Sequence, residues 1–350
     1  MRSFIFLCCW LLAGALQAQA GGTWLYATSF QRGELLVFDL DTGKTVHRLP
    51  VEDGAGIIGF DTSPDGKLLY VVDGSSSSRL RIFEASDLKL LEEERFPNRA
   101  LMLGGPPVTQ LAAGRWLLIQ TYDYPAAAAG VRVYDTHKRV FWPLGLRDRP
   151  AGSTYATGGR EIFGLTSEEA YRLFPPSEEE PDFRVGERVR WPFPRLSQAA
   201  ASPDGGALYA LEFMDYGSRQ WRLGCWAREE GGWKETVRTV DLFKKLAPPD
   251  DPRGGSSSLA LSPDGLWLAV QRGARAWLLD RKSLAVKAAV ELSDVGDHLA
   301  FTRDSRALLT FSHDGRVQRV PVEGGPAVPV LKDPIERTGP PLQVLVAPAP

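Results

Sequence analysis

The sequence predicts an all-β protein, a seven-bladed β-propeller with four strands in each blade, and three observations support this. A Ser-Pro-Asp-Gly phrase recurs between apolar segments along the chain. A second phrase, two apolar residues and then an acid, follows these segments. The repeating units begin roughly 40 to 60 residues apart, a spacing that is typical of propeller blades.

The Ser-Pro-Asp-Gly phrase predicts a tight hairpin between two strands. It occurs at 63–66, 202–205 and 262–265, with a Thr-Arg-Asp-Ser variant at 302–305. Proline presets φ at the first turn position, aspartate accepts local backbone hydrogen bonds, and glycine takes the left-handed conformation. The second phrase, two apolar residues and an acid, predicts a short turn that leads into one more strand. The acid of this phrase is Asp39, Glu84, Asp135 or Asp280. Both kinds of turn are expected on one face of the ring.

The order of the segments predicts how the ring closes. The innermost strands are expected to begin near Gly56, Gly105, Thr154, Ser197, Ser256 and Val295. Three strands precede the first of these, and one spare strand, 341–348, follows the last full blade. The C-terminal strand is therefore expected to complete the first blade as its innermost strand, which removes a free sheet edge. The phrase is weakest in the fourth blade, around 154–191, so six or eight blades stay as alternatives.

The N-terminus reads as an export signal. Arg2 precedes an apolar run from Phe4 to Leu16, and Ala18 and Ala20 frame a cleavage site. We expect a signal peptide at 1–20, a single propeller domain at 21–350, and a soluble periplasmic or secreted protein. A membrane anchor is the alternative, but the run is shorter than the about 20 residues that a spanning helix needs. Cys8 and Cys9 raise a lipoprotein alternative.

Composition limits the function classes. The 350 residues are 43% apolar and 24% charged, with a formal net charge of −2. This composition excludes wholesale disorder and argues against a basic nucleic-acid binder. Signal cleavage would leave Cys225 as the one cysteine, so no internal disulfide is expected.

The hairpin phrases and the closing strand resemble the YVTN and quinoprotein amine-dehydrogenase β-chain class of β-propellers. The resemblance covers nearly the whole mature chain, as repeat pattern and strand order. It implies an exported fold, and a propeller subunit that carries no catalytic cofactor while a smaller partner subunit does. It carries over no functional residue. The signature dipeptides of WD repeats are missing, so a typical WD-repeat scaffold is not expected.

The face opposite the hairpins is expected to hold the longer loops, where binding usually occurs on a rigid scaffold. The loops that lead into the innermost strands contribute a set of arginines: Arg99, Arg147, Arg149, Arg195, Arg253 and Arg337. Around a ring they would form a positive funnel for a carboxylate, a phosphate or an acidic partner. The alternative is that they are ordinary solvated charges, partly neutralised by Asp53, Asp251 and Asp294.

Loops that join second to third strands supply a second set of candidates. They contain tyrosine, aspartate and arginine: Tyr122, Asp123, Tyr124, Asp215, Tyr216 and Arg219. Tyrosine and arginine are enriched at recognition hot spots, so we expect partner contacts here, with loop packing as the alternative. The long segment at 243–255 is either a lid, a docking element or a tolerated insertion.

No local catalytic motif is present. The four histidines form no compact metal motif, and the sequence has no nucleophile elbow, haem-attachment motif or phosphate loop. The prediction is a non-catalytic binding or subunit scaffold for a partner protein or an anionic small molecule, without metal or cofactor. One alternative is a propeller lactonase or hydrolase that gathers scattered acids such as Glu161 at the channel mouth. The other is the propeller subunit of an amine dehydrogenase complex.

Overall fold

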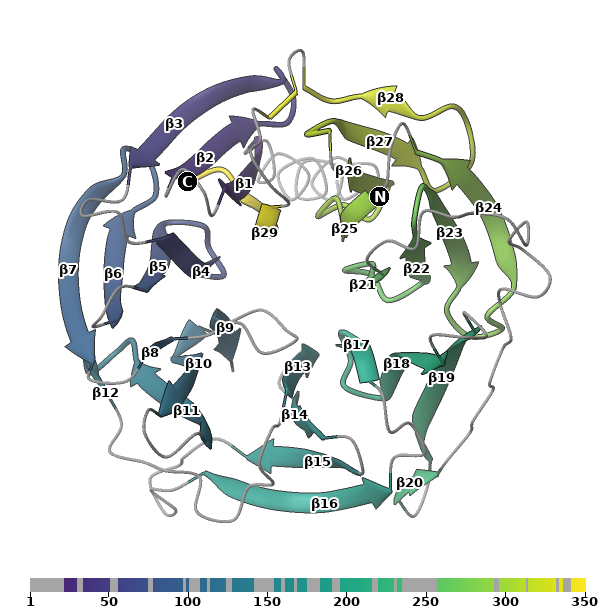
Figure 1. Cartoon of the computed structure of the whole chain (residues 1–350), viewed down its shortest axis with the longest axis horizontal. Coiled ribbons are helices and arrows are strands. Elements are labelled where there is room, and N and C mark those ends of the chain that lie inside the picture. The colour runs from purple at the N-terminus through teal and green to yellow at the C-terminus, as the bar shows by residue number, and fades with distance from the viewer. Residues whose placement is uncertain are drawn as a thin grey trace, which may run out of the picture.

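Seven antiparallel sheets stand in a ring in the computed structural model of the chain (Figure 1). The structure describes residues 22–29, 34–50, 56–74, 78–96, 99–100, 108–111, 114–123, 128–141, 154–158, 161–166, 169–174, 183–190, 196–215, 220–229, 232–234, 257–292, 296–312, 314–331, 334–335 and 341–350. The regular structure of these residues is β, and none of their elements is a helix able to cross a membrane. The predicted seven-bladed propeller is confirmed, with the fourth blade as a regular four-stranded sheet. The expected signal peptide lies outside the described residues.

Each blade adds its strands outward from the axis. The innermost strands are β29 (Pro341–Pro348), β4 (Gly56–Thr62), β9 (Val108–Leu111), β13 (Thr154–Gly158), β17 (Leu196–Ala201), β21 (Ser257–Leu261) and β25 (Gly296–Phe301). The second strands are β1 (Thr23–Ser29), β5 (Leu68–Gly74), β10 (Trp116–Asp123), β14 (Glu161–Leu165), β18 (Ala207–Asp215), β22 (Trp267–Arg272) and β26 (Ala307–Ser312). The third strands are β2 (Glu34–Asp39), β6 (Ser78–Glu84), β11 (Ala128–Asp135), β15 (Glu169–Phe174), β19 (Gln220–Glu229), β23 (Arg275–Asp280) and β27 (Val317–Pro321). The outer strands are β3 (Lys44–Pro50), β7 (Lys89–Phe96), β12 (Val140–Phe141), β16 (Arg184–Arg190), β20 (Gly232–Lys234), β24 (Val286–Glu291) and β28 (Val328–Pro329).

The C-terminal strand closes the ring as expected. β29 pairs antiparallel with β1, for example at Tyr26 and Leu345, and forms the innermost strand of the first blade. Apolar residues of the seventh and first blades share one core cluster, in which Phe311 and Leu309 lie with Leu25 and Phe38. Because neighbouring blades bury such clusters all around the ring, closure adds packed apolar area as well as strand hydrogen bonds.

The third blade differs in one detail from the prediction. Its innermost strand was expected to begin near Gly105, but β9 begins at Val108. A further strand of two residues, β8 (Arg99–Ala100), also pairs with β10, beyond the end of β9. The inner edge of this blade is therefore covered by two short segments instead of one strand.

The recurrent hairpins follow the predicted chemistry and add a hydroxyl to it. Gly66 has a positive φ of 75°, and the Asp65 carboxylate accepts a hydrogen bond from the Lys67 amide at 3.2 Å. The Ser63 hydroxyl donates to the same carboxylate at 2.6 Å and accepts from the Leu68 amide at 2.9 Å. The same hydroxyl-to-carboxylate bond recurs in four more turns, at Ser202–Asp204, Ser262–Asp264, Thr302–Asp304 and Ser312–Asp314. The first residue of the phrase therefore completes the hydrogen bonding of the turn.

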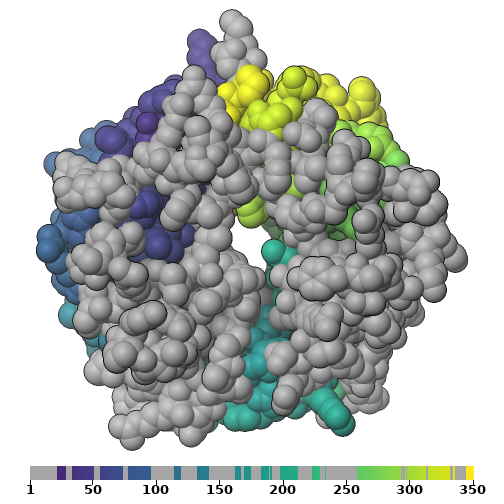
Figure 2. Space-filling view, in the orientation of Figure 1, coloured from purple at the N-terminus to yellow at the C-terminus, as the bar shows by residue number. Residues whose placement is uncertain are grey.

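Two kinds of turn lie on one face of the ring, as predicted. The Ala85 amide, in the turn after β6, donates to the Lys67 carbonyl in the first hairpin at 2.8 Å. The sixth blade repeats this bond between its two turns, from Arg281 to Leu266, and in the fifth blade Arg228, near the end of β19, donates to Gly206 of the hairpin. We call this side the turn face, and the opposite side the loop face. A channel is open at the centre of the ring (Figure 2).

Candidate functional site

The predicted binding residues are only partly described. Eight of them lie outside the described residues: Arg147, Arg149, Arg195, Arg253, Arg337, Tyr124, Tyr216 and Arg219. The segment at 243–255 and the acids Asp53, Asp251 and Asp294 also lie outside them. The predictions on these residues stay predictions, and the placement of four candidates can be compared with the sequence: Arg99, Tyr122, Asp123 and Asp215.

These four candidates lie in strands, where the sequence predicted loops. The ladder between β10 and β11 extends to the pair of Asp123 and Ala128, so Tyr122 belongs to β10. Arg99 lies in β8 and is the direct register partner of Tyr122. Asp215 is the last residue of β18, opposite Gln220. The extra pairing satisfies backbone groups that a loop would have to leave to water.

The structure thus brings three of the candidates together in the third blade and keeps Asp215 apart. Arg99 and Tyr122 are neighbours at the loop-face end of the third blade, although 23 positions separate them in the chain. Asp215 lies in the fifth blade, and the fourth blade stands between them. Arg99, Tyr122 and Asp123 form the part of the predicted recognition surface that the structure describes in the third blade.

A buried ion network lies at the loop-face end of the second blade, and sequence reasoning missed it. Asp73 near the end of β5 is fully buried and binds two arginines of β6. Its Oδ1 accepts from Arg79 Nε at 3.1 Å, and its Oδ2 lies 2.5 Å from Arg81 Nη2. The side chains of Arg79 and Arg81 are only 11% and 7% exposed. The Arg79 contact is a charge-assisted hydrogen bond, a strong class of hydrogen bond in proteins, and the Arg81 contact is an ion pair.

The network anchors the strands that carry a loop. Asp73 is the register partner of Arg79, and the next pair, Gly74 with Ser78, is the last before the chain crosses from β5 to β6. Glu93 of β7 lies 4.0 Å from Arg79 and 3.4 Å from Arg95, so it links the network to the outer strand. The buried ion pairs of Asp73 favour rigid positioning of the loop-face ends of these strands.

A signal for this network was present in the sequence. β6 is an apolar strand with two arginines, Arg79 and Arg81, two positions apart. Residues at this spacing project from the same side of a strand, so a buried acid was to be expected on a neighbouring strand. The partner, Asp73, belongs to the preceding strand and directly faces one of the two arginines.

The described histidines and acids form no metal cluster. Within the residues that the structure describes, no group of three or more His, Cys, Asp or Glu is arranged to hold a metal ion. His47 lies on the outer strand β3, with its ring 5.3 Å from that of Trp24. His298 lies on the innermost strand β25 and is half-buried. Glu161 begins β14, a second strand, and so does not belong to the strands around the channel.

The turn face is electrostatically satisfied by its own hairpins. Hydrogen bonds from the Ser63 and Ser202 hydroxyls hold the pKa of Asp65 and of Asp204 below its ordinary value. Asp204 also lies 3.5 Å from the Arg281 guanidinium of the sixth blade, so this hairpin is tied to the next blade as well. These carboxylates stabilise the hairpins that the structure describes on the turn face.

Comparison with known proteins supports the fold. No protein-family model matches the chain, and no curated protein sequence matches it. Among solved structures, a functionally unknown protein from Desulfotomaculum acetoxidans is similar with a TM-score of 0.64 and 12% identity, over 93% of this chain and 99% of that one. A Bacteroides fragilis protein with a provisional 6-phosphogluconolactonase assignment has a TM-score of 0.63 and 14% identity, over 95% and 99%.

A further similar structure is a haem-related propeller. The dihydro-heme d1 dehydrogenase NirN has a TM-score of 0.58 and 17% identity, over 92% of this chain and 66% of that one. Identities this low show a shared β-propeller fold and leave the activity undetermined, because one fold hosts many functions. The resemblance predicted from the hairpin phrases is supported at the level of the propeller.

Proposed function

We propose that the chain is an exported, non-catalytic β-propeller whose loop face binds a partner protein or an anionic small molecule. One observation carries the proposal, the juxtaposition of Arg99 and Tyr122 as register partners at the loop-face end of the third blade. In the neighbouring second blade, the Asp73 network fixes the loop-face ends of β5 and β6. A rigid scaffold lowers the entropy that recognition loops lose on binding. Arg99 and Tyr122, adjacent on this face, are residue types enriched at binding hot spots.

The export part rests on the sequence alone. The apolar run and small-residue site of 1–20 support secretion to the periplasm or the medium, after signal cleavage. N-terminal sequencing of the protein recovered outside the cytoplasm tests this, with a new terminus at position 21 as the expected result.

The binding proposal is tested on protein recovered from its native exported compartment. Native mass spectrometry of the tagged mature chain should detect a bound protein or small molecule in stoichiometric amount. The double variant Arg99→Ala, Tyr122→Ala should lose this mass, because it removes the described recognition pair. Arg303→Ala is the matched control, since this exposed arginine lies in a hairpin of the turn face and should retain the bound mass. A bare monomer in the wild type, or equal loss in the control, would contradict the proposal.

Two other functions are distinguished by the same preparation. A lactonase is the second candidate, because the similar Bacteroides fragilis structure with that provisional assignment covers 95% of this chain. Turnover of a sugar lactone by the purified protein would replace the non-catalytic proposal. A quinone-bearing small subunit in the recovered complex would instead identify an amine-dehydrogenase propeller subunit.

A further inference from the structure

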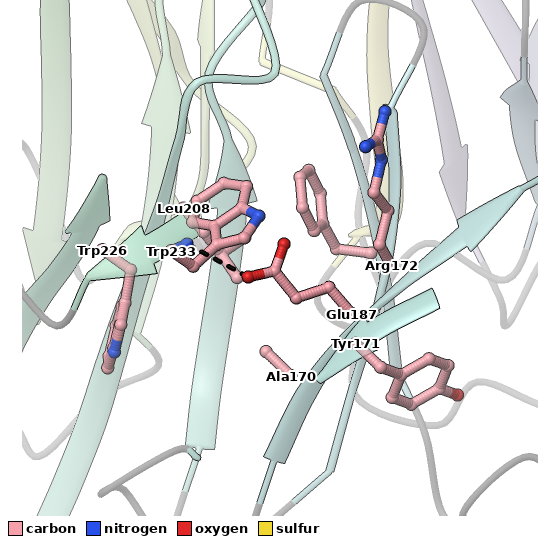
Figure 3. A pocket seen from close by; sticks show the side chains of 8 residues that line it. Ala170, Tyr171, Arg172, Glu187, Leu208, Trp226 and Trp233 are labelled. Atoms are coloured by element: carbon pink, nitrogen blue, oxygen red, sulfur yellow. Dashed lines mark hydrogen bonds between the residues drawn. The ribbon is translucent and has the colours of Figure 1, made fainter. Parts of the chain in front are cut away.

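A crevice between the fourth and fifth blades is a second candidate site, on the rim of the ring. It encloses about 270 Å³ of space that is partly open to solvent, and its walls are almost entirely apolar. Phe163, Leu208 and Trp226 form the buried part, and Trp233 and Glu187 from the outer strands β20 and β16 also line it (Figure 3). Trp233 follows the connection from β19 to β20, so this site is separate from the loop face.

The mouth of the crevice combines an aromatic ring with a carboxylate. The Trp233 amide donates to Glu187 Oε1 at 3.1 Å and so joins the outer strands of the two blades (Figure 3). The Trp233 indole packs edge-on against Phe163, with centroids 5.3 Å apart and planes at 84°. The second oxygen of the exposed Glu187 carboxylate has no hydrogen bond or ion pair with the residues that the structure describes.

Nearby arginines do not neutralise this carboxylate. Arg172 also lines the crevice, but its guanidinium lies over the Phe174 ring at 4.5 Å and points away from Glu187 in Figure 3. Arg184 lies over the same ring at 5.4 Å, and Arg188 pairs with Glu169 at 3.0 Å. The Glu187 carboxylate beside the Trp233 indole is therefore available to a cation of another molecule. A negative charge next to an aromatic ring attracts guanidinium and ammonium groups.

We infer that this crevice binds the guanidinium group of an arginine side chain from a partner polypeptide. A guanidinium is planar and weakly hydrated, so it enters a shallow aromatic slot at lower desolvation cost than an ammonium. The chain itself uses this packing, because Arg115 lies 4.6 Å over the ring of Trp116. The crevice has little enclosed space of its own and opens to solvent beside Glu187, which favours a single side chain that binds at its mouth and is attached to a larger partner.

The test uses short peptides and the whole mature protein. A glycine-flanked arginine peptide is titrated against protein labelled with 5-fluorotryptophan, and the ¹⁹F resonance of Trp233 is assigned from Trp233→Phe. The citrulline peptide is the matched probe, because citrulline keeps the planar shape and lacks the charge. We expect saturable shifts with a dissociation constant of roughly 1 mM for arginine, and at least tenfold weaker binding for citrulline.

Two variants locate the binding. Glu187→Gln retains an amide oxygen for the Trp233 amide and should weaken the arginine peptide at least tenfold. Glu291→Gln is the control, an outer-strand glutamate of the sixth blade that pairs with Arg275, and should leave affinity unchanged. Equal binding of citrulline, equal binding of a lysine peptide, full affinity in Glu187→Gln, or no shift at about 10 mM peptide would each overturn the inference. Failure here leaves the loop-face proposal intact, because that proposal is tested with different variants.

Discussion

Removing Asp73 should destabilise the propeller more than removing any exposed acid. Asp73→Ala deletes the carboxylate that holds two guanidinium groups, at 3.1 Å and 2.5 Å, in a fully buried position. Arg79 keeps Glu93 within 4.0 Å, but Arg81, 7% exposed, has no other carboxylate partner in the described part of the chain. Breaking a buried pair on one side costs about 3–5 kcal/mol, because the remaining charge is left without compensation. We expect about 4 kcal/mol here.

Urea denaturation followed by tryptophan fluorescence measures this effect. With a slope of about 3 kcal/mol/M, a loss of about 4 kcal/mol lowers the midpoint by about 1.3 M. The double variant Asp73→Ala, Arg81→Met should recover about 2 kcal/mol, because it removes the stranded cation and fills the space with an apolar side chain. The control Glu291→Gln breaks an exposed pair and should change stability by less than about 1 kcal/mol. A change below about 1 kcal/mol for Asp73→Ala, or no recovery in the double variant, would refute the reasoning.

Three further predictions concern turns and buried phenols. Gly66→Ala should destabilise the folded protein more than Gly324→Ala, as measured by thermal unfolding. Both glycines have positive φ, but a Cβ at Gly66 would meet a carbonyl oxygen of β29 at 2.6 Å, whereas at Gly324 nothing lies within 4 Å. The Ser202 hydroxyl lowers the folded-state pKa of Asp204, so the free energy of unfolding should fall as the pH drops below about 4. Ser202→Ala should reduce this pH dependence of stability, as measured by urea titrations at pH 2–7. Burial raises the pKa of Tyr70 to about 12, so stability should be lost between about pH 10 and 12, less steeply in Tyr70→Phe, as measured by urea unfolding at alkaline pH.

The fold was predictable because its information is local. Each hairpin needs four consecutive residues with defined turn chemistry, and the repeat brings the same phrase back in successive blades. The closing strand followed from counting, since three strands before Gly56 and one after the last blade complete a sheet. The errors occurred where pairing extends beyond the phrase, as at Arg99 and Tyr122, which lie in β8 and β10 and not in loops.

The contacts that carry the proposals depend on the ring. Glu187 and Trp233 are 46 positions apart and lie in different blades, so no local pattern places the carboxylate beside the indole. The Asp73 network spans fewer residues, but predicting it also requires knowing which side chains are buried. Two arginines in a strand need a buried acidic partner only where water is excluded. Propeller repeats thus specify the scaffold through short phrases, whereas the contact of Glu187 with Trp233 arises only where the rim of one blade meets the next. Exposed rim positions such as Glu187 are consequently where variants of this chain should alter recognition without altering the fold.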